Sequence, residues 1–360
     1  MARLFSLEEI VRVTKGRLQG GMTDRGHACS VVIDSRKARR DCLFVALSGS
    51  KTNGHEYLQE AVQGGASICL VERREWNARK ARVASLLAGR RAAAVEVSDT
   101  LLALQDLALF HLERFPGLLR IGITGSNGKT TTKEIVGCIL SQAAETVVNE
   151  GNLNSETGLP LSAFRVSRHH RYAVFEMAMN HEGEMDGLSR IVKPAAALIT
   201  NIGSAHIEFF GSRRRIALEK KKIFKYFSGK EMGFIHEAEP YFNFLENEVK
   251  GTIIPFGPKS TEGYRGSMDL GLDGTSIDWE GLQVHFPLFG YHNLLNALAA
   301  ITLTQNLGVP PVSIRRGLEN VQPLFGRSQI IRGCITIIQD CYNANPESMR
   351  TVLEIFDSLS

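Results

Sequence analysis

The segment from Gly122 to Glu134, GITGSNGKTTTKE, combines three glycines with Lys129 and three consecutive threonines. A glycine-rich turn that opens a helix presents backbone N–H groups and the positive end of the helix to an anion. At such a turn, Lys129 would add a charge for phosphate oxygens and Thr130 a hydroxyl for magnesium. The pattern G-x-x-x-x-G-K-[ST] is not strictly met, because Gly122 stands one position too early. The segment therefore predicts a variant loop for the phosphates of a nucleoside triphosphate.

Two more residues of metal-binding type follow predicted strands. Glu176 lies near the end of YAVFE, and His206 comes just after ITNIGSA. In an open α/β sheet, ligands bind beyond the carboxyl ends of the strands, where the glycine-rich loop also lies. A carboxylate, an imidazole and a threonine hydroxyl around a triphosphate suit magnesium, which prefers oxygen ligands and takes histidine less often. The alternatives are a surface carboxylate for Glu176 and a helix cap for His206.

The segment RRRIALEKKKIFKYF, residues 213–227, places one lysine of three on an apolar helix face. Residues spaced by three or four positions share a face. The residues that share the face of Lys220 are Ile216, Ile223, Phe224 and Phe227. Lys221 and Lys222 rotate away from it toward water. Because an ammonium group would repel magnesium, Lys220 either binds phosphate or is chemically modified. The alternative is a lysine that extends along the apolar stripe to reach solvent.

Alternating strands and helices must position these residues. The apolar runs predict strands at 118–123, 172–178, 196–203 and 232–236, separated by helices as in a mostly parallel sheet. Asp-Gly and Glu-Gly breaks between 266 and 290 predict antiparallel hairpins, and a helix at 293–308 follows. A strand pair at 329–340 and a helix from Pro346 complete the chain.

These elements predict an α/β protein whose chain is divided into several parts. Residues 1–97 mix short strands with helices and form an N-terminal domain, and a helix at 98–117 links it to a central domain at 118–328. Residues 329–360 hold one hairpin and one helix, which cannot bury an independent core. We therefore expect the beginning of a third, C-terminal domain.

Composition places limits on the class of protein. The chain has 360 residues, 43% hydrophobic residues and a formal net charge of +4, typical of a globular protein with two or three domains. Its basic residues are scattered and lack interleaved aromatics, which disfavours a nucleic-acid partner. The six cysteines include no C-x-x-C pair, so neither a zinc site nor a disulfide framework is indicated. No apolar run has the length of a signal peptide or membrane span, and a reduced, cytoplasmic protein is expected.

The sequence resembles the Mur ligases, ATP-dependent amide-bond ligases of peptidoglycan synthesis. GITGSNGKTTT is similar to the phosphate loop of that family, including its variant glycine spacing. Residues 151–162, 175–212 and 340–349 resemble the MurF type in particular. The segment DSRKARRDCLFVALSGSKTNGHEY, from Asp34 to Tyr57, resembles a uridine-nucleotide domain shared with the MurE type. The resemblance covers nearly the whole chain.

This resemblance implies a fold and an activity. The fold would have a smaller N-terminal α/β domain, a central domain with a mostly parallel P-loop-like sheet, and a C-terminal α/β domain that is truncated here. The enzyme would use ATP and Mg²⁺ to add D-alanyl-D-alanine to UDP-N-acetylmuramoyl-tripeptide through an acyl phosphate. A monomer without nucleic-acid partner or membrane span is expected.

The resemblance also assigns roles to single residues by their place in the motifs. The loop residues would bind the ATP phosphates: Gly125, Ser126, Asn127, Gly128, Lys129, Thr130 and Thr131. The remaining ATP-binding positions would be His292, Asn293, Arg327 and Asp340. One magnesium would be held by Thr130 and Glu176, and a second by Glu176, His206 and a carbamylated Lys220. The catalytic residues would be Lys129, His206 and Lys220. The contacts of the UDP substrate would be Ser35, Arg36, Asn152 and Asn154.

Three departures from the family are visible. Cys341 stands where a second aspartate usually follows Asp340, and a thiol cannot replace a carboxylate as a ribose acceptor. Ala178 stands where glycine is common. Relatives continue for roughly another domain, about 100 residues, so residues 1–360 are expected to bind substrates with little turnover. Three alternative functions remain: a MurE-type or folylpolyglutamate-synthase-like ligase, a nucleotide-binding module without turnover, and a nucleic-acid-dependent NTPase.

Overall fold

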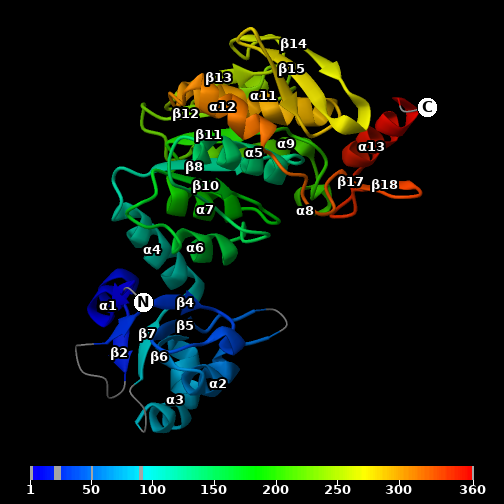
Figure 1. Ribbon diagram of the computed structural model, residues 1–360. Coiled ribbons are helices and arrows are strands. Elements are labelled where there is room, and N and C mark those ends of the chain that lie inside the picture. Colours follow the sequence, from blue (N-terminus) through cyan, green and yellow to red (C-terminus); the bar gives the residue numbers. More distant parts are fainter. Residues whose placement is uncertain (1–2, 20–25, 50–51, 89–91, 359–360) are drawn as a thin grey trace. The chain divides into compact units, whose positions relative to one another are not determined.

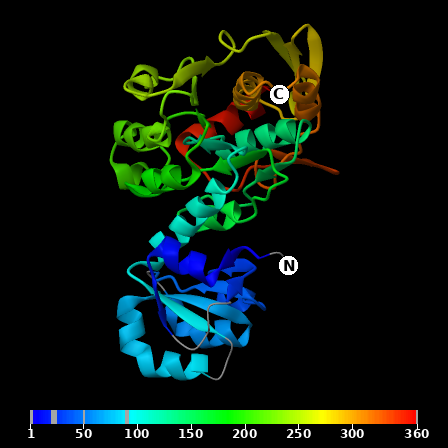
Figure 2. The same cartoon turned by 90° about the vertical axis from the view of Figure 1, so that its left-hand side faces the viewer.

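The computed structural model describes residues 3–19, 26–49, 52–88 and 92–358. The chain forms two compact units, shown in Figures 1 and 2. The N-terminal unit contains Met1–Pro116 and Glu156–Val166, and the central unit contains Gly117–Ser155 and Ser167–Ser360. No helix in the described part of the chain is both long and apolar enough to cross a membrane.

The N-terminal unit is built on a five-stranded sheet in the order β2-β7-β6-β5-β4. Its strands are parallel except for β2, which is antiparallel to β7. The sheet strands are β2 (Arg17–Gln19), β4 (Ser30–Val32), β5 (Cys42–Val45), β6 (Ala66–Glu72) and β7 (Ala93–Val97). The other elements before the last helix are β1 (Phe5–Ser6), α1 (Leu7–Thr14), β3 (His27–Ala28), η1 (Ser35–Lys37), η2 (Gly54–Tyr57), α2 (Leu58–Gln63) and α3 (Arg73–Ala88). The strands β5, β6 and β7 are near-continuous apolar runs because parallel strands are covered on both faces.

The helix expected at 98–117 is α4 (Thr100–Glu113), and it lies in the core of the N-terminal unit. Asp99 caps its first turn by accepting a hydrogen bond from Leu102 N at 2.9 Å. Its apolar residues Leu104 and Leu107 are fully buried in one cluster with the residues of α1. The helix also packs against α6 (Gly158–Ala163), which lies far along the sequence. The apolar surface of α4 therefore serves packing within this unit.

The buried His111 of α4 makes the stability of this unit depend on pH. Burial lowers the pKa of His111 to about 4, whereas an unfolded histidine titrates near about 6.5. The unfolded chain therefore binds a proton first as pH falls, and stability is lost from about pH 6.5 toward pH 4. We expect this histidine alone to cost about 2 kcal/mol between pH 7.5 and pH 5.

The variant His111→Phe should consequently lose less free energy of unfolding over this interval than the wild type, as measured by urea titration at both pH values. It should also be less stable at pH 7.5, because it lacks the hydrogen bond between His111 Nε2 and Val166 O at 2.9 Å. The exposed His285, replaced in the same way, serves as the control. An unchanged pH dependence in His111→Phe would contradict the assignment.

The central unit is built on a six-stranded parallel sheet in the order β13-β12-β11-β8-β10-β9. Its strands are β8 (Leu119–Thr124), β9 (Thr146–Val148), β10 (Tyr172–Glu176), β11 (Ala196–Ile199), β12 (Met232–His236) and β13 (Thr252–Phe256). The helices between them are α5 (Lys129–Ser141), α7 (Glu184–Val192), α8 (Ile207–Phe210), α9 (Arg213–Lys221), η3 (Lys222–Phe224) and α10 (Phe242–Glu246). The predicted parallel sheet is confirmed, with strands at the four predicted places, although β10 and β11 end before residues 178 and 203. The two edge strands, β9 and β13, were not predicted.

Alternation along β8 separates the two faces of this sheet. Ile121 and Ile123 belong to the buried cluster that includes α5, whereas Gly122 between them faces Ile223 of η3 and Met177. In Figure 1, α5, α11 (Tyr291–Asn306) and α12 (Pro311–Glu319) lie on one side of the sheet and α7 on the other.

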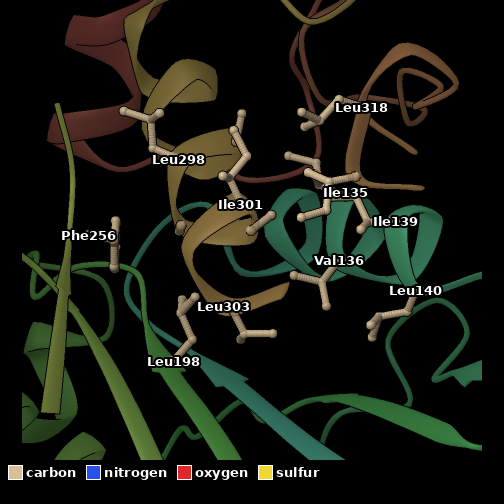
Figure 3. Close-up of a cluster of buried hydrophobic side chains, with 14 of the residues drawn as sticks. Ile135, Val136, Ile139, Leu140, Leu198, Phe256, Leu298, Ile301, Leu303 and Leu318 are labelled. Atoms are coloured by element: carbon tan, nitrogen blue, oxygen red, sulfur yellow. The ribbon is translucent and has the colours of Figure 1, made fainter. Parts of the chain in front are cut away.

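Figure 3 shows the larger of these cores. Ile135 and Ile139 of α5 point toward α11 and α12, where Ile301 and Leu318 meet them, while Val136 of α5 points toward the sheet. The spacing of the apolar residues in α5 thus fixes the helix between sheet and outer helices, with its N-terminus at the glycine-rich loop.

The rest of the central unit follows the sheet in sequence. An antiparallel sheet of β14 (Tyr264–Asp269), β15 (Thr275–Trp279) and β16 (Leu282–Phe286) forms the predicted hairpins, with η4 (Gly271–Asp273) between the first two strands. The predicted strand pair is β17 (Gln329–Arg332) with β18 (Thr336–Gln339), and the predicted last helix is α13 (Pro346–Ser358).

Candidate nucleotide and metal site

The glycine-rich loop lies between β8 and α5, as predicted. Gly128 is the N-cap residue of α5 and has a left-handed φ of 79°. A Cβ on Gly128 would lie 2.5 Å from Asn296 Oδ1, and one on Gly125 would overlap the hydroxyl of Thr200. Both glycines are therefore required by close approach of neighbouring side chains. The loop therefore requires glycine at 125 and 128, three positions apart, whereas the strict pattern places its two glycines five positions apart.

The end of β11 holds the loop in place. Asn201 Oδ1 accepts a hydrogen bond from Asn127 N at 3.0 Å, and Asn201 Nδ2 donates to Asn127 O at 3.1 Å. Thr200 Oγ1 donates to the same carbonyl at 2.5 Å, and Ser126 Oγ accepts from Gly203 N at 2.8 Å. Side chains at the end of the neighbouring strand therefore help to fix the backbone of the loop. The fixed backbone in turn sets the directions of the remaining loop N–H groups.

Two lysines converge on one carbonyl of this loop. Lys129 Nζ donates to Gly125 O at 3.0 Å, and Lys220 Nζ donates to the same oxygen at 2.8 Å. Burial, followed by the charge of Lys129, lowers the pKa of Lys220 well below its usual value. Burial also lowers the pKa of Lys129, while the Glu176 carboxylate opposes this shift. At both lysines, burial therefore favours the neutral amine.

The burial of Lys220 excludes a lysine that extends to solvent, because its side chain is only 2% exposed. Lys221 and Lys222 lie off this buried face, as predicted, but both are partly buried and bonded to the protein. Lys221 Nζ donates to the carbonyl oxygens of Phe244 and Asn247. Lys222 Nζ pairs with the buried carboxylate of Glu219, whose other oxygen caps the start of α7.

Glu176 is fully surrounded by polar partners at the end of β10. Its Oε2 accepts from Thr130 Oγ1 and its Oε1 from Asn154 Nδ2, both at 2.8 Å. The side chain is 2% exposed, which excludes a surface carboxylate. A buried carboxylate beside a hydroxyl supplies oxygen atoms of the kind that magnesium prefers.

His206 is the N-cap residue directly before α8 and has a left-handed φ of 65°, and its side chain makes no cap hydrogen bond. Burial, Lys129 and Lys220 lower its pKa, so the ring is held neutral, as a metal ligand must be. The described residues contain no group of three or more His, Cys, Asp or Glu side chains with metal-ligand placement.

One cavity of about 540 Å³ in the central unit unites most of the predicted residues. Those that line it are Ser126, Asn127, Gly128, Lys129, Thr130, Thr131, Asn154, Glu176, His206, His292, Asn293, Arg327 and Asp340. Gly125 is buried directly behind them, where it is bound by Lys129 and Lys220.

The far part of the cavity joins the start of α11 to the hairpin of β17 and β18. The Arg327 guanidinium lies 4.0 Å from the ring centre of Tyr342, a cation–π contact. Asp340 Oδ1 accepts from Ser328 N at 3.2 Å. Burial lowers the pKa of His292, and the charge of Asp340 opposes this shift. Cys341, the residue that departs from the family, is exposed.

The predicted contacts of the UDP substrate are divided between the units. Asn152 Oδ1 accepts from Tyr342 Oη at 2.6 Å in the central unit. Ser35 and Arg36 form η1 in the N-terminal unit, where Ser35 Oγ donates to Glu60 at 2.7 Å and Arg36 pairs with Asp34. Residues 50 and 51 of the segment that resembles a uridine-nucleotide domain lie outside the described residues.

Sequence reasoning missed the asparagines that support the site. Asn149 follows β9 directly and Asn201 follows β11, so both occupy the strand-end position that drew attention to Glu176. Tyr342 and Asn345 were missed as well, although they line the same cavity. The strand-end rule would have found the first two, but the last two required the tertiary structure.

Comparison with known proteins agrees with this geometry. The family description "Mur ligase middle domain" matches residues 123–304, and "Mur ligase family, catalytic domain" matches residues 27–111. A Treponema pallidum protein named UDP-N-acetylmuramoyl-tripeptide–D-alanyl-D-alanine ligase is 40% identical over 99% of this chain and 77% of its own length.

Solved structures show the same relationship. MurF from Acinetobacter baumannii has a TM-score of 0.87 and 31% identity over 98% of this chain and 76% of its own. MurF from Thermotoga maritima in complex with ADP has a TM-score of 0.76 and 30% identity over 91% of this chain and 74% of its own. The chain therefore belongs to the Mur ligase family and, within it, to the MurF type.

Proposed function

We propose that this protein is an ATP-dependent ligase that joins D-alanyl-D-alanine to UDP-N-acetylmuramoyl-tripeptide, a step in the synthesis of peptidoglycan precursors. The observation that carries the proposal is that Lys129, Thr130 and Glu176 meet at the carboxyl ends of two neighbouring strands, β8 and β10, and line one cavity of about 540 Å³. The names of relatives that align over nearly the whole chain support the choice of substrates. Because the reaction consumes ATP, we expect the enzyme in the cytoplasm, where it would act as a monomer.

The proposed reaction has two steps. A terminal carboxylate oxygen of the tripeptide attacks the γ-phosphorus of ATP, the bond to the β,γ-bridging oxygen breaks, and ADP leaves. The amine of D-alanyl-D-alanine then attacks the acyl carbon of the acyl phosphate and loses a proton, and inorganic phosphate leaves. Neither step needs a covalent nucleophile from the protein, so catalysis depends on positioning and on stabilising charge.

The loop residues 125–131 would hold the triphosphate, with Lys129 placed to stabilise negative charge on the transferred phosphoryl group. The nucleoside would lie toward His292, Asn293, Arg327 and Asp340 in the far part of the cavity. With Cys341 in place of a second acceptor, Asp340 would be the carboxylate available to a ribose hydroxyl.

Thr130 and Glu176 would hold one magnesium ion, and Glu176, His206 and a carbamylated Lys220 would hold a second. Bound magnesium would act as a Lewis acid on phosphoryl oxygens. The tripeptide nucleotide would be recognised by Ser35 and Arg36 in the N-terminal unit and by Asn152 and Asn154 in the central unit.

The test is the release of phosphate from ATP by the purified protein with UDP-muramoyl-tripeptide, with and without D-alanyl-D-alanine. We expect release of phosphate, and a ligated product by mass spectrometry, only when both substrates are present, at the low turnover expected of residues 1–360. Turnover with a single amino acid in place of the dipeptide would indicate a MurE-type ligase, and turnover with a folate would indicate a folylpolyglutamate-synthase-like one. Hydrolysis stimulated by DNA or RNA, or binding of ATP without any turnover, would reject the proposal.

A further inference from the structure

We infer that Asn149, supported by the buried Lys133, is a positioning residue that orients Glu176 and thereby sets the affinity of the nucleotide site for magnesium. The inference rests on the proposed role of Glu176 as a metal ligand. It concerns two residues that neither bind substrate in the proposed mechanism nor belong to the predicted site.

The side chain of Asn149 is bound on both sides to the backbone of Glu176. Asn149 Oδ1 accepts from Glu176 N at 2.8 Å, and Asn149 Nδ2 donates to Glu176 O at 3.3 Å. Only 1% of Asn149 is exposed, so water cannot replace these bonds. The carboxamide therefore fixes the peptide groups on both sides of the Glu176 Cα atom.

The position of Asn149 in the sheet explains this arrangement. The ladder between β9 and β10 has Val148 opposite Val174 as its last pair, and Asn149 N still donates to Val174 O at 3.3 Å. Beyond this point the chain turns away, and the side-chain amide of Asn149 takes the place of the next peptide group on Glu176. The main chain is thereby released for the following loop without leaving the strand end unpaired.

The same amide also holds that loop. Asn149 Nδ2 donates to Leu153 O at 2.9 Å. The next residue, Asn154, donates from Nδ2 to Glu176 Oε1 at 2.8 Å and accepts from Ala178 N at 3.0 Å. One asparagine thus fixes the backbone of Glu176 directly and one of its carboxylate oxygens through Asn154.

Lys133 supports Asn149 from α5, one turn after the phosphate-binding residues of the helix. Its ammonium group donates to Asn149 O at 2.8 Å and pairs with Glu134 Oε1 at 2.9 Å, and the residue is fully buried. Burying a charge is costly unless it is paired and hydrogen-bonded. Lys133 therefore ties the strand end that carries Asn149 to the helix that carries Thr130, the other partner of the Glu176 carboxylate.

The expected effect is a weaker metal site with an intact fold. Residues that orient metal ligands typically change metal affinity by about 10- to 100-fold when replaced. In Asn149→Ala, the Mn²⁺ affinity of the ADP complex, followed by electron paramagnetic resonance, should fall by at least about 10-fold. Affinity for ADP measured by calorimetry in excess EDTA should stay within about twofold, because the loop and Lys129 are unchanged. A merely structural residue would lower both affinities together.

Two variants complete the design. Asn149→Asp retains the acceptor for Glu176 N but loses the donor to Glu176 O and Leu153 O, so its Mn²⁺ affinity should lie between those of wild type and Asn149→Ala. It also allows the measurement if the alanine variant does not fold. The matched control is Asn306→Ala, which removes an asparagine side chain at the C-terminal end of α11, where its Nδ2 donates to Thr302 O. This variant should bind Mn²⁺ like wild type.

Glu176→Ala separates failure of the inference from failure of the proposed function. If Glu176→Ala lowers Mn²⁺ affinity while both Asn149 variants leave it unchanged, the positioning role of Asn149 is refuted. If Glu176→Ala itself has no effect on Mn²⁺ affinity, the proposed role of Glu176 is wrong and the inference falls with it.

Discussion

Replacing Lys129 with alanine is expected to reduce the rate of ligation by at least about 100- to 1000-fold, the usual cost of removing one preorganised group that stabilises a transition state. The loop backbone should persist, because Asn201 and Thr200 hold Asn127 independently of the lysine. Phosphate release under saturating substrates measures the effect. The variant should fold normally in a thermal melt, since Lys129 is only partly buried.

Affinity for UDP-muramoyl-tripeptide should remain within about twofold of wild type in Lys129→Ala, as measured by calorimetry without ATP. The reason is that Lys129 belongs to the central unit, whereas Ser35 and Arg36 belong to the N-terminal unit. Arg36→Ala is the opposite case: it should lower the affinity for the UDP substrate more than it lowers the affinity for ADP. A comparable loss of UDP-substrate affinity in Lys129→Ala would show that this division between the units is mistaken.

Replacing Lys220 with alanine is expected to lower activity by about 100-fold, in the range of lost metal-site groups, and short carboxylates such as acetate should restore part of it. Burial and the neighbouring Lys129 lower the pKa of Lys220, so a larger fraction of its amine is neutral and can react with carbon dioxide. A carboxylate in solution would then replace the oxygen ligand that the carbamate supplies.

Lys221→Ala is the matched control for this experiment, because its amine donates to the carbonyl oxygens of Phe244 and Asn247 and not to the loop. It should keep wild-type activity and show no response to acetate. Lys222→Ala is a poorer control, since it removes the partner of the buried Glu219. Full activity of Lys220→Ala would disprove the metal-ligand assignment, and a loss that no carboxylate rescues would favour a role in holding Gly125 O.

Much of the central fold could be predicted from sequence because its signals are local. Apolar runs such as 118–123 and 232–236 became strands of the parallel sheet, and the helix expected at 98–117 became α4. Packing over long sequence distances carries no such signal. Nothing local in Gly158–Ala163 indicates that this helix packs against α4. The strand order β13-β12-β11-β8-β10-β9 likewise does not follow the order of the strands along the chain.

For the candidate site, the sequence by itself determined the chemical groups and their place at strand ends. Residue type and periodicity indicated the glycine spacing, Lys129, Glu176, His206 and the single inward-facing lysine of the three at 220–222. The tertiary structure alone decided how those groups are held. Asn201 pins the loop and Asn149 orients Glu176 through hydrogen bonds between neighbouring parallel strands, and such partners are chosen by the order of strands in space rather than by nearness along the chain.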